Sequence, residues 1–211
     1  YSWNVNGTCG QSKIEYIVLD KEPVNLKIIN ENDSSLLKES KTLDNALIRE
    51  NFQRNFALKK LHEVNDNDLI LINDLDEIPE LKNFSYKNKI TIFKQRMLYF
   101  KFNLVYKNLS WTGSKICKKK DLISPQWLRN IKTRKYPLWR LDIFFSKKKY
   151  NNIEIIENGG WHFTNIKTAD QIHHIMISFL HHFEYENSGL TPDMIEKLIK
   201  DKKALYNYNA D

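Results

Sequence analysis

The sequence predicts an α/β fold in which a central mixed, mostly parallel sheet is flanked by helices. A run of four apolar residues, Leu69 to Ile72, follows a helix-like pattern and is typical of a strand that is buried on both faces. Segments rich in β-branched and aromatic residues follow it, and two helix-like patterns close the chain. The 211 residues fit one domain with a hydrophobic core of its own.

The elements of the N-terminal part follow from hydrophobic periodicity. The stretch IEYIVLD, residues 14–20, alternates as a strand does. Residues 30–41 are charged and serine-rich, which indicates a connection. A helix is predicted over residues 43–62, because apolar side chains recur at every fourth position from Ile48 to Phe56. The apolar run described above would then be the first central strand.

Strands dominate the next part of the sequence. Residues 90–106, ITIFKQRMLYFKFNLVY, predict one or two strands, and residues 111–119 predict another after a glycine turn. A short helix and a loop are expected over residues 124–142. Residues 153–163, IEIIENGGWHF, predict a strand, a break at two glycines, and an aromatic–histidine–aromatic triplet.

Two helices are predicted at the end of the chain. Apolar side chains recur at i, i+3, i+4, i+7, i+8 and i+11 from Ile172 to Phe183, which is the pattern of one helix face. Thr168 and Gln171 form a capping box in front of that face. The last helix is expected to begin with Thr191 as N-cap, followed by a proline at the first helical position.

The formal charge of +7 and the pI of about 9.2 favour anionic partners such as phosphorylated small molecules. The lysines are dispersed, without the basic stripe and interleaved aromatics of a nucleic-acid-binding surface, so we expect no nucleic-acid partner. The abundance of Lys, Asn and Ile also fits an AT-rich genome, and codon usage would then account for the basicity. This composition suggests a bacterial or viral source.

The sequence favours a cytoplasmic protein. No apolar run approaches the roughly 18 to 20 residues that cross a bilayer, although peripheral contact with a membrane is compatible with the charge. Cys9 and Cys117 form no CxxC pair, and a reducing compartment is the simpler interpretation. The chain begins at Tyr1 rather than at a methionine, so an N-terminal anchor or targeting segment would lie outside it.

An acidic stretch follows the apolar run. Asp74, Asp76 and Glu77 place three carboxylates within four positions, and their mutual repulsion requires a positive group nearby. In an extended segment Asp74 and Asp76 would point to one side while Leu75 points back into the protein. Two such carboxylates suit Mg²⁺ or Mn²⁺, which prefer oxygen ligands. The structural alternative is that Asp76 caps a turn and Asp74 is solvated.

Four stretches of the sequence occur in an order that resembles a known enzyme family. They are RENFQRN (49–55), LINDLDEIPE (71–80), NGGWHF (158–163) and SFLHHFEYEN (178–187). Together, over roughly residues 43–208, they resemble glycosyltransferase family 17, the family of the bisecting N-acetylglucosaminyltransferases of N-glycans.

The resemblance implies a GT-A fold, a single catalytic domain over residues 1–211, and inversion at the anomeric carbon. It implies Mn²⁺ or Mg²⁺ as cofactor, a UDP-linked nucleotide-sugar as donor, and an oligosaccharide or glycoconjugate as acceptor. Asp74 and Asp76 match the metal-binding acids of the family's DXD motif, and the metal would be the positive group that the acidic stretch requires. Only residues 1–13 precede the first matching strand. The chain is therefore expected to lack part of the N-terminal nucleotide-binding region or to be cut from a longer protein.

The resemblance also suggests roles for other residues. His162 would complete the metal coordination or contact a phosphate; the alternative is a histidine packed between Trp161 and Phe163. Arg49 and Arg54 are candidates for donor binding, although residues five apart do not share a helix face. Trp111 and Trp139 could stack on a sugar ring, or they could belong to the core. The histidines at 173, 174, 181 and 182 are expected to line a solvated or cleft-lining helix face, and a metal cluster is the alternative.

Transfer by single displacement requires a base that removes a proton from the acceptor hydroxyl. Glu184 and Asp142 are the candidates, in that order, and a surface salt bridge is the alternative role for each. The competing functions are a non-catalytic sugar-binding module and a nucleic-acid-binding module.

Overall fold

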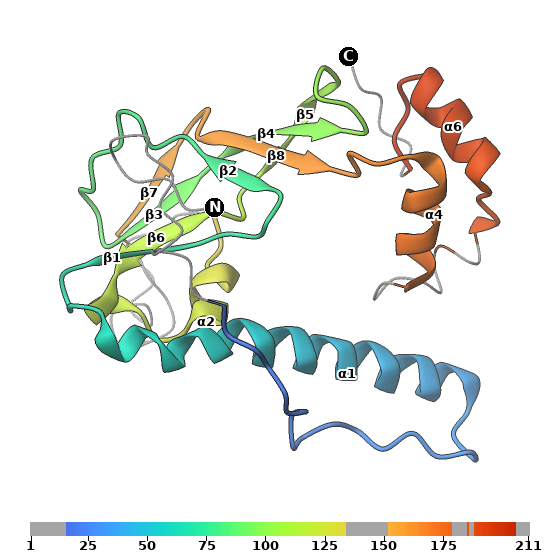
Figure 1. Ribbon diagram of the computed structural model, residues 1–211, viewed down its shortest axis with the longest axis horizontal. Coiled ribbons are helices and arrows are strands. Elements are labelled where there is room, and N and C mark those ends of the chain that lie inside the picture. Colours follow the sequence, from blue (N-terminus) through green and yellow to red (C-terminus); the bar gives the residue numbers. More distant parts are fainter. Residues whose placement is uncertain (1–15, 134–151, 179–184, 186–187, 206–211) are drawn as a thin grey trace, which may run out of the picture. The chain divides into compact units, whose positions relative to one another are not determined.

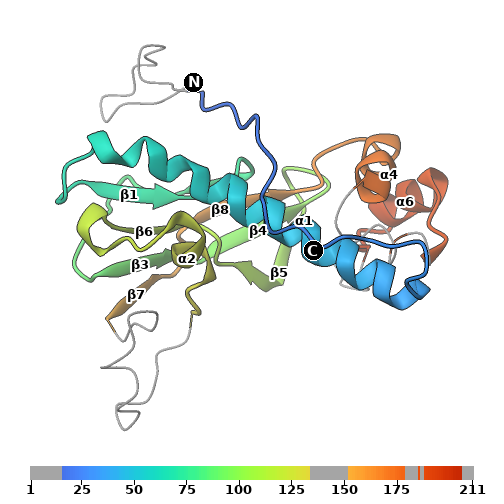
Figure 2. The same cartoon turned by 90° about the horizontal axis from the view of Figure 1, so that it is seen from below.

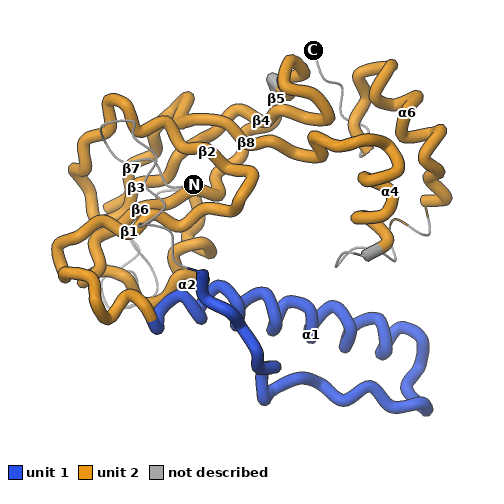
Figure 3. The backbone as a smooth tube through the Cα atoms, in the orientation of Figure 1, with its two compact units in different colours: residues 1–59 blue, residues 60–211 orange. Residues whose placement is uncertain are grey.

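The computed structural model describes residues 16–133, 152–178, 185 and 188–205 (Figure 1). The chain divides into two compact units, residues 1–59 and residues 60–211 (Figure 3). The prediction of one catalytic domain over residues 1–211 stays a prediction.

The first unit contains one long helix, α1 (Ser35–Phe56), followed by the 3-10 turn η2 (Ala57–Lys59). The side chain of Ser34 caps α1 by accepting a hydrogen bond from the Leu37 amide at 3.3 Å. This cap starts the helix eight residues before the predicted position, inside the stretch that was expected to be a connection. The predicted helix end at residue 62 is also wrong, since α1 ends at Phe56.

The segment before α1 is held to the helix by one buried side chain. Asn45 accepts a hydrogen bond from the Lys27 amide at 2.6 Å, and its side-chain amide donates to the Lys27 carbonyl at 2.8 Å. The predicted strand over residues 14–20 is wrong for its described part: residues 16–20 form no strand, and Tyr16 and Val18 are exposed. An alternating pattern forms a strand only where a neighbouring strand accepts its backbone hydrogen bonds.

The second unit contains two four-stranded mixed sheets (Figure 1). The first has the order β1 (Leu69–Ile72), β6 (Lys115–Lys118), β3 (Ile90–Phe93) and β7 (Ile153–Ile156). The second has the order β2 (Glu77–Pro79), β8 (Gly160–Thr164), β4 (Gln95–Tyr99) and β5 (Val105–Trp111). The only parallel neighbours among them are β3 with β7 and β4 with β8.

The α/β class with mixed sheets flanked by helices is confirmed, but the expected predominance of parallel strands is wrong. Two segments, β3–β4 and β7–β8, each run from the first sheet into the second. They lie side by side and parallel, and they provide both parallel strand pairs. β6, β2 and β5 pair antiparallel with β3, β8 and β4, and β1 pairs antiparallel with β6. At the junction, the Lys94 amide donates to the Ile156 carbonyl, and the Gly159 amide donates to the Lys94 carbonyl at 2.7 Å.

The predicted bounds of β1 are correct, but its predicted position as a central strand is wrong. It lies at the edge of the first sheet, and Leu69 is 42% exposed. The fully buried strand of this sheet is β3, from Ile90 to Phe93. A short apolar run identifies a strand, but it does not distinguish a centre from an edge that other segments partly cover.

Helices complete the two cores of this unit. The short helix α2 (Pro125–Asn130) contacts β1 and β6 of the first sheet (Figure 2), and its Leu128 is fully buried among the sheet's isoleucines. The helices α4 (Ala169–Ser178) and α6 (Pro192–Lys200) contact each other and pack against the second sheet. The unit also contains two 3-10 turns, η3 (Leu61–Glu63) and η4 (Lys119–Asp121).

The predicted helix starts near the C-terminus are confirmed. The Gln171 amide donates to Thr168 Oγ1 at 3.3 Å, and the Thr168 amide donates to Gln171 Oε1 at 3.1 Å, which completes the capping box. Thr191 Oγ1 accepts from the Met194 amide at 3.4 Å. Among the helices of the described residues, none combines the length and the apolar character that crossing a bilayer requires.

Gly160 offers a test of the β2–β8 pairing. Its φ is +123°, and a Cβ atom there would lie 2.1 Å from the Ile78 carbonyl oxygen. We expect Gly160→Ala to lower the free energy of unfolding by more than the roughly 1 to 2 kcal/mol of the conformational strain alone. Urea denaturation measures this change. The matched control is Gly189→Ala, where φ is +65° and no atom lies within 4 Å of the new methyl group. Equal losses in the two variants would contradict the steric argument.

Candidate functional site

The acidic stretch forms a tight turn between the two sheets. The Glu77 amide donates to the Asp74 carbonyl at 3.1 Å, and Leu75 at the tip is fully exposed. The prediction that Leu75 points into the protein is therefore wrong. An extended segment would keep Asp74 and Asp76 on one side, but a turn separates the environments of the two side chains. This turn carries the chain from β1 of the first sheet to β2 of the second.

Glu77 is the anchor of the turn, with 3% of its surface exposed. Its Oε1 accepts from the indole nitrogen of Trp111 at 2.5 Å, and its Oε2 accepts from the hydroxyl of Ser114 at 3.0 Å. Arg129 donates to both oxygens, at 2.7 and 2.9 Å, and the Asp74 amide donates to Oε2 at 3.2 Å. Five donors occupy both carboxylate oxygens, so the buried charge is fully satisfied.

A second layer of residues fixes these donors. The one hydroxyl proton of Ser114 goes to Glu77, so the Ser114 oxygen is free to accept from the side-chain amide of Gln95, at 3.1 Å. Gly113 leaves the space that the network needs, because a Cβ atom at this position would lie 1.9 Å from Glu77 Oε1 and 2.3 Å from the indole nitrogen of Trp111. The stretch WTGS therefore supplies two donors and the room for them.

Arg129, in the last turn of α2, is the positive group that the turn requires. Its guanidinium pairs with Glu77 and with Asp74 Oδ2, and its side chain is 9% exposed. The helix end that carries Arg129 is itself held: Lys115 Nζ donates to the carbonyls of Arg129 and Ile131. Burial, together with the neighbouring Arg129 charge, lowers the pKa of Lys115 to about 8.

Sequence reasoning missed Arg129, because 52 residues separate it from Glu77. The sequence does contain one local signal that points to Arg129, the start of a short helix. Ser124 and Pro125 start a short helix, and the Ser124 hydroxyl accepts from the Trp127 amide at 3.1 Å. Arg129 is the only cation of that helix.

Asp76 faces His162 on β8. Asp76 Oδ2 lies 3.3 Å from His162 Nε2, and His162 Nδ1 lies 3.0 Å from Thr164 Oγ1. The imidazole stacks on the Trp111 ring, with centroids 4.6 Å apart and an angle of 12° between the planes. The alternative of a histidine packed between its chain neighbours is wrong, since Trp161 and Phe163 lie on the opposite face of the strand from His162.

The pKa values of Glu77 and Asp76 are both lowered, but by different interactions. Burial raises the pKa of Glu77, but the hydrogen bonds from Arg129 and Trp111 outweigh it, so the pKa lies below its ordinary value. For Asp76 the hydrogen bond to His162 is the largest effect and lowers the pKa, against a smaller opposing effect of burial. Both carboxylates are therefore held in the ionised form at neutral pH.

The arrangement offers ligand atoms for a metal ion. Oxygen atoms of Asp76 and Glu77 and a nitrogen of His162 lie within 4.8 Å of one another. Glu77 is already saturated with donors, so the atoms available to an ion are those of Asp76 and His162. With Nδ1–H donating to Thr164, the Nε2 lone pair would face the ion, and metal-binding histidines usually donate their other ring N–H to a neighbouring oxygen in this way. A carboxylate and an imidazole suit Mn²⁺.

The predicted metal ligands are thus partly brought together. Asp76 and His162 are in contact, whereas Asp74 pairs with Arg129 on the other side of Glu77. Trp111, expected either in the core or on a sugar platform, instead links Glu77 to His162. Of the four histidines at 173, 174, 181 and 182, His173 contacts the Tyr185 hydroxyl through Nδ1 at 2.7 Å.

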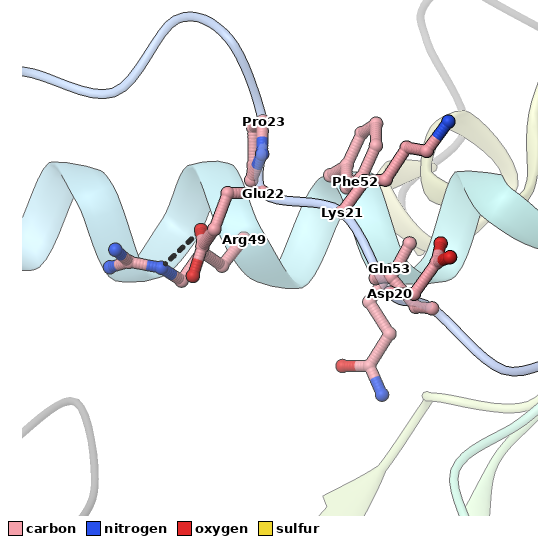
Figure 4. A pocket seen from close by; sticks show the side chains of 8 residues that line it. Asp20, Lys21, Glu22, Pro23, Arg49, Phe52 and Gln53 are labelled. Carbon is pink, nitrogen blue, oxygen red and sulfur yellow. Dashed lines mark hydrogen bonds and ion pairs between the residues drawn. The ribbon is translucent and has the colours of Figure 1, made fainter.

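The arginines predicted to bind the donor lie on α1 in the first unit. Arg49 pairs with Glu22 at 2.9 Å and lines a pocket of about 330 Å³ with Phe52 and Gln53 (Figure 4). Arg54 pairs with Glu50 of its own helix at 2.9 Å. The predicted bases, Glu184 and Asp142, lie outside the described residues, as do Trp139, His181 and His182.

No protein-family model, curated protein or solved structure matches the chain. The resemblance to glycosyltransferase family 17 therefore rests on the four sequence stretches alone.

Removing the positive partner of Glu77 tests the network. We expect Arg129→Met to lower the free energy of unfolding by about 3 to 5 kcal/mol, because it leaves a buried carboxylate unpaired. Urea denaturation measures the loss. The exposed cation Lys120 provides the control, where Lys120→Met should change stability by no more than about 0.5 kcal/mol. The double variant Glu77→Leu, Arg129→Met should lose less than Arg129→Met alone. A loss below about 1 kcal/mol for Arg129→Met would contradict the network.

The lowered pKa of Glu77 predicts a pH dependence. Because the folded-state pKa lies below the ordinary value of 4.5, ionised Glu77 stabilises the fold above that pH and loses this contribution as the pH falls through the folded pKa. Unfolding free energies of the protein and of Glu77→Gln, measured from about pH 7 down to about pH 3, should therefore converge on the acid side. A stability difference that stays constant over this range would show that Glu77 does not titrate with a lowered pKa.

Proposed function

We propose that this chain is a metal-dependent inverting glycosyltransferase that transfers a sugar from a UDP-linked donor to a hydroxyl of a glycan. The observation that carries the proposal is the contact between Asp76, on the turn after β1, and His162, on β8. These two residues come from two of the four stretches that resemble glycosyltransferase family 17. Their contact, next to the pairing of Glu77 with His162, supports the proposal because it brings the acidic turn and the GGWHF stretch together.

Rigid support of the acidic turn favours a site over a solvated loop. Glu77 fixes the turn through buried hydrogen bonds, while Asp76 keeps a half-exposed carboxylate. A ligand-binding carboxylate needs both properties: a backbone that does not move and an oxygen that the ligand can reach.

The proposed roles follow from these positions. Asp76 and His162 would hold Mn²⁺ or Mg²⁺, with Asp74 as a further ligand on release from Arg129. The bound ion would neutralise the diphosphate that leaves the donor sugar. His162 is oriented by Thr164 and by the Trp111 ring, so its Nε2 stays directed at Asp76. Glu184, or otherwise Asp142, remains the proposed base that takes the acceptor proton.

The test is the binding of a nucleotide with metal. A thermal-shift series with UDP, GDP and CMP, each with Mn²⁺ or with a chelator, should give a shift for UDP that requires Mn²⁺. Ligand at about 100 times its Kd would add about 2.7 kcal/mol to the unfolding free energy. The shift should disappear in Asp76→Asn and persist in Asp66→Asn, a matched exposed acid before β1. No shift with any nucleotide would overturn the donor site.

Turnover separates an enzyme from a sugar-binding module. The protein with Mn²⁺ should release UDP slowly from a UDP-sugar, and Asp76→Asn should not. Donor binding without any release of UDP, with water or with glycan acceptors, would contradict the enzymatic proposal.

A further inference from the structure

A second polar surface lies on the opposite face of the sheet that carries His162. The strand pairs place four side chains in one row across β2, β8, β4 and β5 of Figure 1. This row consists of Ile78, Trp161, Arg96 and Ser110, and all four are exposed. The next row along the strands, Glu77, His162, Met97 and Tyr106, is buried. The alternation separates the two faces.

Trp161 is the apolar centre of this exposed row. It is 37% exposed, and its neighbour Ile78 is 51% exposed, although a large apolar side chain in a sheet normally faces the core. Arg96 lies beside Trp161 on the other side, in the parallel β4–β8 pair. An exposed indole between an aliphatic and a cationic side chain offers a flat surface for a ring that is apolar on its face and polar at its edge.

A pocket of about 330 Å³ adjoins the row at Arg96. Its lining includes the polar residues Lys94, Arg96, Ser110, Glu157 and Asn158. It lies where β4 and β5 lose their register between Arg96 and Met97, and such an irregularity opens space between strands. The turn between β7 and β8 supplies Asn158, whose φ of +53° belongs to the left-handed region that asparagine tolerates.

The charges of the pocket leave one cation without a carboxylate. Lys94 pairs with Glu157 at 3.0 Å. The Arg96 guanidinium donates only to Asn158 Oδ1, through two long hydrogen bonds of 3.4 Å. Within the part of the chain that the structure describes, no carboxylate lies within ion-pair distance of Arg96. Its fork of donors therefore matches one planar anion from a ligand.

We propose that this surface binds a saccharide whose sugar unit carries one carboxylate, as a uronic acid does. The sugar ring lies on Trp161, its carboxylate pairs with Arg96, and its hydroxyls bond to Asn158, Ser110 and Glu157. A single anionic group balances the one unpaired cation. Glu157, which pairs with Lys94, can accept hydrogen bonds from hydroxyls, and a single cation without a carboxylate does not match the repeated phosphates of a nucleic acid. The proposal is independent of the metal site, which faces the other side of the sheet.

The experiment is a calorimetric titration of the chain with two matched tetrasaccharides. One alternates N-acetylglucosamine with glucuronate, and the other contains N-acetylglucosamine only. The acidic tetrasaccharide should bind without Mn²⁺, at least about tenfold more tightly than the neutral one, and more weakly at high salt. Arg96→Gln should remove the preference, whereas Lys101→Gln, an exposed cation on the loop after β4, should retain it.

Two further variants make the outcome decisive. Trp161→Ala should lose binding, and Trp161→Phe should recover part of it, provided that circular dichroism shows both to be folded. Asp76→Asn should bind the acidic saccharide as the unaltered protein does, so a failed metal site and a failed saccharide site are told apart. Equal affinity for the two saccharides, no binding of either, or tighter binding of a single-stranded oligonucleotide at the same residues would overturn the proposal.

Discussion

The buried ion pair between Glu77 and Arg129 is the interaction on which the site depends. A fully buried carboxylate is unfavourable unless every oxygen is bonded, and here the donors come from β5, from the glycine turn after it and from α2. These segments lie far from Glu77 in the sequence, so their hydrogen bonds to Glu77 join the acidic turn to both sheets. Lys115 supports Arg129 in turn, because its side chain donates to the Ile131 carbonyl at the C-terminal end of α2. The hydrogen bonds that neutralise the buried Glu77 carboxylate therefore set the position of Asp74 and Asp76.

The strand segments β3–β4 and β7–β8, which pass from one sheet into the other, explain why the second sheet carries two different surfaces. Both β3–β4 and β7–β8 pass from the first sheet into the second, and the backbone bonds at Lys94 and Gly159 lock them side by side. Past this junction, β8 points His162 to the buried face and Trp161 to the exposed face. Gly159, just before β8, lies against Phe93, and Gly160, the first residue of β8, lies against the backbone of Ile78 to Glu80. The same strand therefore supplies residues of both the proposed metal site and the proposed saccharide surface.

Local features of the fold could be predicted from the sequence, and the pairing of segments could not. Capping at Thr168 and Thr191 depends on neighbouring residues and was predicted correctly. The alternating residues 16–20 were predicted as a strand, but a strand needs a partner that the pattern does not contain. In the site, the acidic turn and His162 could be singled out by residue type. Arg129 could not, because its role comes from a tertiary contact across 52 residues.

The repulsion within the acidic turn does not require a metal ion, because the protein provides its own cation. Arg129 neutralises Asp74 and Glu77, and His162 Nε2 lies 3.3 Å from Asp76. A metal would therefore meet a site that is already folded. It would compete with the contact between half-exposed Asp76 and His162, which is separate from the buried hydrogen bonds of Glu77. The buried pair at Glu77 would stay intact. The proposed binding of a metal ion at Asp76 would therefore be separable from folding, unlike binding at metal centres that organise their own domain.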